Sequence, residues 1–402
     1  MMAGGSKMFS RSNPVSRPAR LARGMAFAMI LSVIAGCAAV DNAEPPAPLT
    51  EISNPVALKQ HWLIDSGEGI RENYHDMRPL LLGGRVYTID TLGEIKQIDP
   101  SNGEVDWSFS SGLPAIAGLE GVGQHLVATS SEGDVALFKL LQDGLEPAWR
   151  TRLPSEIRSP ARIDRELVFV RGGDGKLHAL KLSNGESVWV AIRSVPALSL
   201  TGTSRPWVYR DLVIAGFDNG KMAAFDRLTG TTEWEVTIGT PRGRTEIERL
   251  VDIDGQFVLR DGVVYTSSFQ GNLAALTAST GQVIWSREFS SSQALAIDDK
   301  AIYLVDNRSH LWSVDRRTGS AFWKQDVLSA RKVTAPAIFG PHLVVGDFEG
   351  YVHWFERADG RLVGRRPVMD LRILSQPIAL QDRALLLDAG GELAAIAPKS
   401  EQ

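Results

Sequence analysis

Few residues of this chain have the type and spacing that metal binding or catalysis requires. The seven histidines are dispersed, and His178 and His353 lie among apolar residues in segments that favour strands. A packed, hydrogen-bonded histidine is the commoner outcome there than a metal ligand. The acidic pairs Asp252-x-Asp254 and Asp298-Asp299 lack the glycine and distal glutamate of an EF-hand loop. The sequence has no phosphate-binding loop, zinc-protease motif or nucleophile elbow. We therefore expect neither an enzyme nor a bound metal or cofactor.

The single cysteine, Cys37, indicates a different chemistry, the attachment of lipid. Before it come five basic residues and an apolar stretch too short to span a bilayer, as in a secretory signal peptide. The segment Ile34-Ala35-Gly36-Cys37 resembles a bacterial lipobox, in which the cysteine is lipidated and becomes the mature N-terminus. The alternative is an ordinary signal peptide with a stray cysteine. We predict a signal peptide over residues 1–36 and a flexible tether over residues 37–52.

The rest of the chain is organised by a sequence pattern that returns about every forty residues, for example from Gly175 to Trp189. A full copy has a branched apolar run, a glycine turn, a short strand, an Asx-Gly or Thr-Gly turn and a strand containing tryptophan. This predicts four short antiparallel strands per unit. Ser309 and seven turn glycines mark eight units; the glycines are at positions 93, 133, 175, 220, 271, 350 and 391. We predict an all-β, eight-bladed β-propeller over residues 53–398, followed by a short tail, 399–402.

The ends of the repeat predict how the ring closes. The eighth unit stops at Pro398 without an outermost strand, whereas the segment around Trp62 is a tryptophan strand without a unit. We expect this N-terminal strand to complete the eighth blade, because a long unpaired edge would promote aggregation. The repeated tryptophans are expected to be wedges between blades and not a cofactor stack. Gly364 replaces the tryptophan of the seventh unit, so that seam should be looser or filled from elsewhere.

Charge argues against nucleic acid as a partner. The formal net charge is −4, and it becomes more negative once the basic signal segment is removed. Binding to a phosphate backbone needs clustered lysine and arginine.

Two intervals of the repeat are longer than the rest. The 51-residue interval contains Gly239 to Asp261, and the 45-residue interval contains Val190 to Trp207. Extra residues in repeat proteins form loops on one face, which is often the binding face. We therefore expect a partner to bind where the period is longest.

The repeat, G-x-apolar-x-A-apolar-D-x-x-T-G-x-x-x-W, resembles that of quinoprotein (PQQ-type) propellers. Together with the lipobox and eight units, three stretches resemble the BamB family of lipoproteins of the outer-membrane β-barrel assembly (BAM) complex; they are residues 196–202, 245–254 and 344–354. The resemblance implies a scaffold that binds BamA through its periplasmic POTRA domains and assists insertion of β-barrel proteins. It also implies attachment to the periplasmic face of the outer membrane, since Ala38 and not aspartate follows Cys37.

The same resemblance implies that Leu198, Leu200, Asp252 and Asp254 contact the partner. The family often has arginine where this chain has Thr201. That charge would have to be supplied by another residue, with Arg242, Arg244 and Arg249 as candidates. Strand edges of the ring would also suit contact with unfolded outer-membrane protein chains by β-augmentation.

Other interpretations of these residues remain open. Leu198 and Leu200 alternate as strand residues do and could belong to the core, and the two aspartates could be solvated turn residues. The alternative function is a PQQ-dependent periplasmic dehydrogenase. A third interpretation is a lipoprotein propeller with an unrelated partner.

Overall fold

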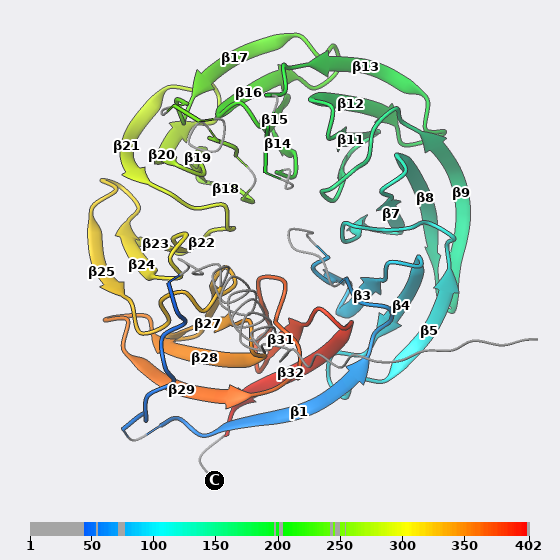
Figure 1. The fold of residues 1–402 in the computed structure, drawn as a ribbon. Coiled ribbons are helices and arrows are strands. Elements are labelled where there is room, and N and C mark those ends of the chain that lie inside the picture. The colour runs from blue at the N-terminus through cyan, green and yellow to red at the C-terminus, as the bar shows by residue number, and fades with distance from the viewer. Residues whose placement is uncertain are drawn as a thin grey trace, which may run out of the picture. The chain divides into compact units, whose positions relative to one another are not determined.

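The computed structural model describes residues 44–53, 55–70, 77–196, 198–200, 204–241, 244–245, 250–253 and 255–399. In these ranges the regular elements are β-strands, arranged as eight four-stranded antiparallel sheets. The sheets surround a common axis, so the predicted eight-bladed propeller is confirmed (Figure 1). Within the described ranges, no helix is long and apolar enough to cross a membrane.

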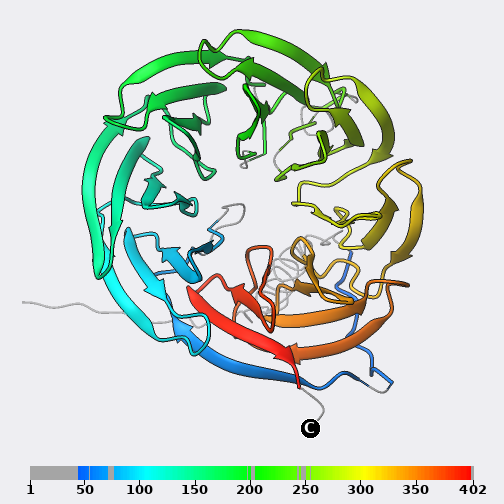
Figure 2. The same ribbon diagram turned by 180° about the vertical axis from the view of Figure 1, so that it is seen from behind.

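Each blade runs from a short inner strand to a longer outer one, and the ring is continuous from both sides (Figure 2). The innermost strands are β2 (Leu80–Leu82), β6 (Glu120–Val122), β10 (Arg162–Asp164), β14 (Trp207–Tyr209), β18 (Val258–Arg260), β22 (Ala296–Ile297), β26 (Ala337–Phe339) and β30 (Ile378–Ala379). The second strands are β3 (Arg85–Ile89), β7 (His125–Thr129), β11 (Leu167–Arg171), β15 (Leu212–Gly216), β19 (Val263–Ser267), β23 (Ala301–Val305), β27 (His342–Gly346) and β31 (Ala384–Leu387).

The third strands are β4 (Glu94–Ile98), β8 (Asp134–Leu141), β12 (Lys176–Lys181), β16 (Lys221–Asp226), β20 (Gly271–Thr277), β24 (Leu311–Asp315), β28 (Tyr351–Glu356) and β32 (Glu392–Pro398). The outermost strands of blades 1 to 7 are β5 (Val105–Ser110), β9 (Gly144–Arg152), β13 (Ser187–Ile192), β17 (Thr232–Thr237), β21 (Val283–Phe289), β25 (Ala321–Gln325) and β29 (Leu362–Pro367). The outermost strand of blade 8 is β1 (Leu58–Asp65), from the other end of the propeller.

The ring is closed as the sequence predicted. β1 pairs antiparallel with β32, with Leu63 opposite Ala394. Trp62 is 9% exposed, and its indole N–H donates to the carbonyl of Pro100 in blade 1 at 3.1 Å. The N-terminal strand therefore joins blades 8 and 1.

Five other repeated tryptophans bridge neighbouring blades in the same way, whereas the indole N–H of Trp107 has no hydrogen-bond partner among the described residues. The indole N–H groups of the five donate to a main-chain carbonyl of the next blade: Trp149 to Leu182, Trp189 to Arg227, Trp234 to Ala278, Trp285 to Arg316 and Trp323 to Arg357, at 2.8 to 3.2 Å. Each ring also lies against the glycine of that blade's second turn. The predicted wedge role of these tryptophans is confirmed.

One of these seams gives a sharp stability test. Gly281 has a φ of +69°, and a Cβ there would lie 2.7 Å from the ring of Trp234. Gly340 has a similar φ of +54°, but a Cβ there would meet nothing within 4 Å. We expect Gly281→Ala to lower the free energy of unfolding by about 2–4 kcal/mol, and Gly340→Ala by about 1 kcal/mol. Urea denaturation of both variants measures the difference, and equal losses would contradict the wedge geometry.

The junction between blades 7 and 8, where Gly364 replaces the tryptophan, is filled by residues from another part of the chain. This confirms one of the two predictions made for Gly364. Gly364 lies opposite Trp354, which is fully buried in the third strand. The N-terminal segment covers the glycine, since a Cβ there would contact the carbonyl of Val56 and the side chain of Leu58. The N–H of Val56 donates to the carbonyl of Val363 at 2.7 Å.

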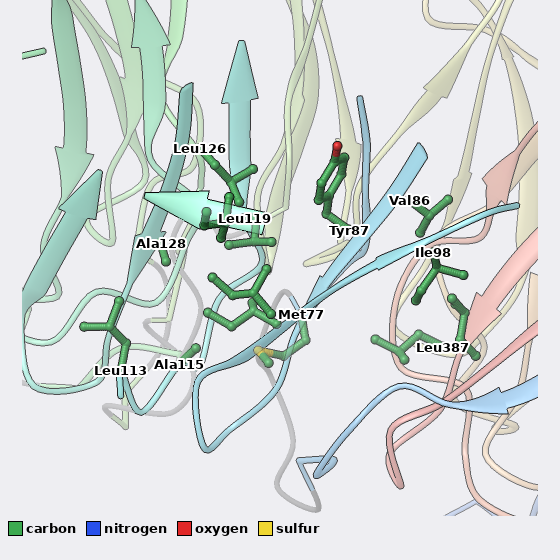
Figure 3. Packing of buried hydrophobic residues seen from close by; sticks show 14 of the residues in the cluster. Met77, Val86, Tyr87, Ile98, Leu113, Ala115, Leu119, Leu126, Ala128 and Leu387 are labelled. Atoms are coloured by element: carbon green, nitrogen blue, oxygen red, sulfur yellow. The ribbon is translucent and has the colours of Figure 1, made fainter. Parts of the chain in front are cut away.

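Apolar side chains of successive blades interleave to form the core. In one buried cluster, Leu387 of blade 8, Val86 and Tyr87 of blade 1 and Leu126 of blade 2 pack together (Figure 3). Met77, from the connection before β2, belongs to the same cluster.

Residues 46–52, expected to belong to the tether, contact blades 6 and 7. The N–H of Ala47 donates to the carbonyl of Ser329 at 2.9 Å, and its own carbonyl accepts from Arg331 Nη1 at 3.1 Å. Arg365 donates to the carbonyl of Thr50. Contacts of the propeller thus begin before residue 53.

Arg331, which donates to the carbonyl of Ala47, also belongs to a buried polar network. Its Nε donates to Asp347 Oδ2 at 2.8 Å, and the Nε2 of His353 lies 2.9 Å from the same oxygen. Burial lowers the pKa of His353, and Asp347 opposes this shift. The expectation that His353 is a packed, hydrogen-bonded residue is confirmed.

Candidate partner-binding site

The two long connections lie beside each other. Residues 193–206 follow β13, and residues 238–257 follow β17, so both leave the outermost strands of neighbouring blades 3 and 4. Because the strands are antiparallel, all connections that leave outermost strands lie at the same end of the blades. We call this end the insertion face. The prediction that both insertions form loops on one face is confirmed.

A buried carboxylate connects the two insertions. Asp252, in the second insertion, is 0% exposed, and its Oδ2 accepts the N–H of Leu200 in the first. The carbonyl of Asp252 accepts the N–H of Phe269 at 2.9 Å, which fixes it to blade 5. Its neighbour Ile253 packs so closely on Gly216 of blade 4 that a Cβ at the glycine would lie 2.7 Å from it. The first insertion thus lies against the second, which is itself fixed to blades 4 and 5.

The environment of Asp252 disfavours its charge. Oδ1 has no hydrogen-bond partner among the residues that the structure describes. Burial raises the pKa of Asp252 to about 7, with the N–H of Leu200 opposing the shift and the nearby Asp218 adding to it. Near neutral pH the carboxyl group of Asp252 is therefore partly protonated.

Near Asp252, a buried ion pair joins blades 3 and 4. Arg171 at the end of β11 is 1% exposed, and its Nη2 lies 3.1 Å from Asp218 Oδ1 after β15. The guanidinium group also lies over the ring of Phe217, 4.5 Å from its centre. Burial raises the pKa of Asp218, and Arg171 opposes this shift. This pair was not predicted from the sequence, because Asp218 stands shortly before a turn glycine, the context of an ordinary turn residue.

The first insertion carries an apolar surface. Leu198 is 42% exposed and Val195 38%, while Leu200 is half-buried. The interpretation of Leu198 as a core residue is therefore wrong, and Leu200 lies between the two interpretations. Charged groups lie beside this surface, since Arg193 Nε of the first insertion and Lys221 Nζ of blade 4 each lie 2.7 Å from the carboxylate of Glu235 in blade 4. An apolar centre with a polar rim is the composition of a protein interface.

The remaining predicted residues have different outcomes. Asp252 is not a solvated turn residue, and its buried side chain offers no surface to a partner; it holds Leu200 instead. Arg244 is exposed. Five positions lie outside the described residues: Cys37, Thr201, Arg242, Arg249 and Asp254.

Comparisons with known proteins agree with the family resemblance of the sequence. A sequence profile of the family described as outer membrane protein assembly factor BamB matches residues 92–325 and 314–400. The outer membrane protein assembly factor BamB of Bordetella pertussis is 32% identical over 382 residues, covering 94% of this chain and 97% of that protein. The crystal structure of BamB from Moraxella catarrhalis has a TM-score of 0.76 at 23% identity, covering 85% of this chain and 100% of that one.

A likeness to dehydrogenases extends to the fold alone. A europium-containing methanol dehydrogenase has a TM-score of 0.68 at 12% identity, covering 85% of this chain and 93% of that one.

Proposed function

Because this chain belongs to the BamB family of outer membrane protein assembly factors, we propose that it is a non-enzymatic scaffold of the BAM complex that binds the POTRA domains of BamA. In this role it assists the folding and insertion of β-barrel proteins. The rigid ring would keep the partner's domains in a fixed arrangement without doing chemistry.

The observation that carries the proposal is the apolar surface of the first insertion. Leu198 is 42% exposed, and Asp252 holds its loop through the N–H of Leu200, so the leucine is already in position for binding. Little side-chain and loop entropy then remains to be lost on association. We assign direct partner contact to Leu198 and Leu200, and a positioning role to Asp252. Asp254 remains a proposed contact.

The anchoring part of the proposal rests on the sequence. Cys37 would carry the lipid and hold the protein at the periplasmic face of the outer membrane. The nine residues between Cys37 and Ala47 span at most about 30–35 Å when extended. Ala47 itself contacts Ser329 on the insertion face, the end of the ring that carries the proposed binding surface.

Charge substitution of one leucine tests the site. We expect Leu198→Glu to weaken binding to a purified BamA POTRA fragment by about 10- to 100-fold, because it places a charge in the apolar centre of the interface. The matched control is Leu228→Glu. Leu228 is 54% exposed and lies in the turn between β16 and β17, at the opposite end of blade 4.

Both variants should unfold within about 0.5 kcal/mol of the wild type, since both side chains are on the surface. Calorimetric titration measures the two affinities. Equal affinities for the Leu198 and Leu228 variants would remove the first insertion from the interface. Absence of binding by the wild-type protein would contradict the scaffold function itself.

The dehydrogenase alternative is not adopted. The likeness to a methanol dehydrogenase is one of fold at 12% identity, and a shared propeller does not carry a shared activity.

A further inference from the structure

The first residue of the innermost strand differs between blades. In five blades this residue is apolar: Leu80, Val258, Ala296, Ala337 and Ile378. In blades 2, 3 and 4, which are consecutive around the ring, the residue is Glu120, Arg162 and Trp207 respectively (Figure 1). Each innermost strand begins where the connection from the preceding blade ends, so these three residues lie at the insertion face. The exception to the apolar pattern therefore coincides with the blades around the first insertion.

The carboxylate of Glu120 links the innermost strands of blades 2 and 3. Glu120 is 2% exposed, and its Oε1 accepts the N–H of Ile163 at 3.4 Å and lies 3.6 Å from Arg162 Nη1. The guanidinium group of Arg162 in turn lies over the ring of Trp207 in blade 4, 4.4 Å from its centre. A carboxylate buried in this way is costly unless cations pair with it.

The second oxygen of Glu120 reaches the first insertion. Oε2 accepts a hydrogen bond from Nη2 of Arg205, the last residue but one of the insertion and 85 positions further along the chain. The preceding residue, Ser204, is 1% exposed, and its Oγ accepts the N–H of Gly216 at 3.2 Å. The C-terminal end of the insertion is thus fixed to blade 4 and, through Glu120, to blade 2.

The N-terminal end of the insertion is fixed by a different ion pair. The N–H of Arg193 donates to the carbonyl of Gly175 at 3.0 Å, and its Nη2 donates to Thr232 Oγ1 at 2.9 Å. Its Nε lies 2.7 Å from the carboxylate of Glu235. With the contact between Leu200 and Asp252, the first insertion has three points of attachment, and Glu120 provides the one at the C-terminal end.

The charge of Glu120 holds two arginines together. Without that charge, the guanidinium groups of Arg162 and Arg205 would face each other with no carboxylate between them, and like charges at short range repel. Arg162 belongs to a strand and is also held by the ring of Trp207, whereas Arg205 belongs to a loop. We therefore expect the repulsion to displace the loop and not the strand.

We propose that Glu120 is a positioning residue for partner binding, which holds the C-terminal end of the first insertion through Arg205 and so keeps Leu198 and Leu200 in place. This inference rests on the proposed function of the first insertion. Glu120 is too buried to offer a surface to a partner. Its effect on affinity comes from order in the free loop, because a loop that is already fixed loses less conformational freedom on binding.

The test compares Glu120→Gln with the wild type in the full-length protein. Hydrogen exchange of the main-chain N–H groups of residues 193–206, followed by mass spectrometry, measures the order of the free insertion. Calorimetric titration measures the affinity for the POTRA fragment. We expect exchange in the insertion to be about 10-fold faster and binding about 3- to 10-fold weaker. Arg205→Met should cause the same two changes, and it leaves Glu120 paired with Arg162 should the glutamine variant fail to fold.

The matched control is Asp134→Asn. Asp134 is 3% exposed, belongs to blade 2 and also carries two arginines, with Arg150 Nη2 at 2.8 Å and Arg152 Nη1 at 3.8 Å, but neither arginine belongs to the first insertion. Its replacement should leave exchange in residues 193–206 and the affinity as in the wild type, whatever it does to overall stability. In the Arg205→Met background, Glu120→Gln should add nothing further to either measurement, because Glu120 acts through Arg205.

Unchanged exchange in residues 193–206 of Glu120→Gln would overturn the positioning role. So would an equal increase in Asp134→Asn, or an effect of Glu120→Gln that adds in full to that of Arg205→Met. Faster exchange with unchanged affinity would overturn the link between positioning and binding. Exchange is measured without BamA, so failure of the wild type to bind the POTRA fragment is a separate result, which contradicts the proposed function itself.

Discussion

Replacing Arg171 with methionine is expected to lower the free energy of unfolding by about 3–5 kcal/mol, because the change leaves a buried carboxylate without its counter-ion. Asp218 is 4% exposed, and its pKa is already raised by burial with Arg171 opposing. Methionine preserves most of the side-chain volume, so the loss reports the charge and not a cavity. Urea denaturation at pH 7 measures it.

Two further variants make this test specific. Arg171→Met combined with Asp218→Leu should recover part of the lost stability, since no buried charge is then left unpaired. Arg152→Met removes an arginine that is 61% exposed and paired with Glu132, and should cost no more than about 1 kcal/mol. A loss for Arg171→Met as small as that for Arg152→Met would show that the buried pair does not stabilise the junction of blades 3 and 4.

The second large effect concerns Asp252→Asn, which should stabilise the protein increasingly as the pH rises. The pKa of Asp252 is raised from its usual value of about 3.9 to about 7. Between these values the folded state binds a proton that the unfolded state has lost, so wild-type stability falls as the pH increases and levels off above pH 7. Asparagine has no such charge, and its side-chain oxygen can still accept the N–H of Leu200.

The stability advantage of Asp252→Asn over the wild type should therefore grow by about 2–3 kcal/mol between pH 5 and pH 8. Chemical denaturation at both pH values measures this double difference. An advantage that stays constant with pH would contradict the raised pKa. If the proposed roles are right, this variant should still bind the POTRA fragment, because Asp252 is assigned the positioning of Leu200 and no direct contact.

The parts of the fold that repeat were predictable from sequence, because each turn glycine and tryptophan appears several times against a varying background. Even the exceptions to the repeat had a signal in the sequence. Trp62 lies in a tryptophan-containing strand that belongs to none of the eight units, and Gly364 occupies the tryptophan position of the seventh unit. How the Gly364 seam is filled was not predictable. Val56 and Leu58 reach it from more than three hundred residues away along the chain, and no local pattern encodes such a contact.

The candidate site was predictable at the level of segments and not of side-chain roles. Long intervals identified the two insertions, because extra residues in a regular repeat must leave the sheets. Whether Asp252 points outward or inward depends on Leu200, Gly216 and Phe269, which belong to other segments. The interblade ion pair of Arg171 and Asp218 was missed for the same reason, since each residue has an ordinary local context.

The pairing of β1 with β32 has a consequence for the order of assembly. The strand synthesised first has its hydrogen-bonding partner in the last strand, with Leu58 opposite Pro398. Such a contact has nearly the greatest sequence separation that the chain allows, and contacts of this kind form slowly. Blades 1 to 7 can each form from consecutive residues, whereas blade 8 must wait for both ends. Closure of the ring is thus a late step in folding, and until it occurs the exposed strand edges are the region most open to misassembly.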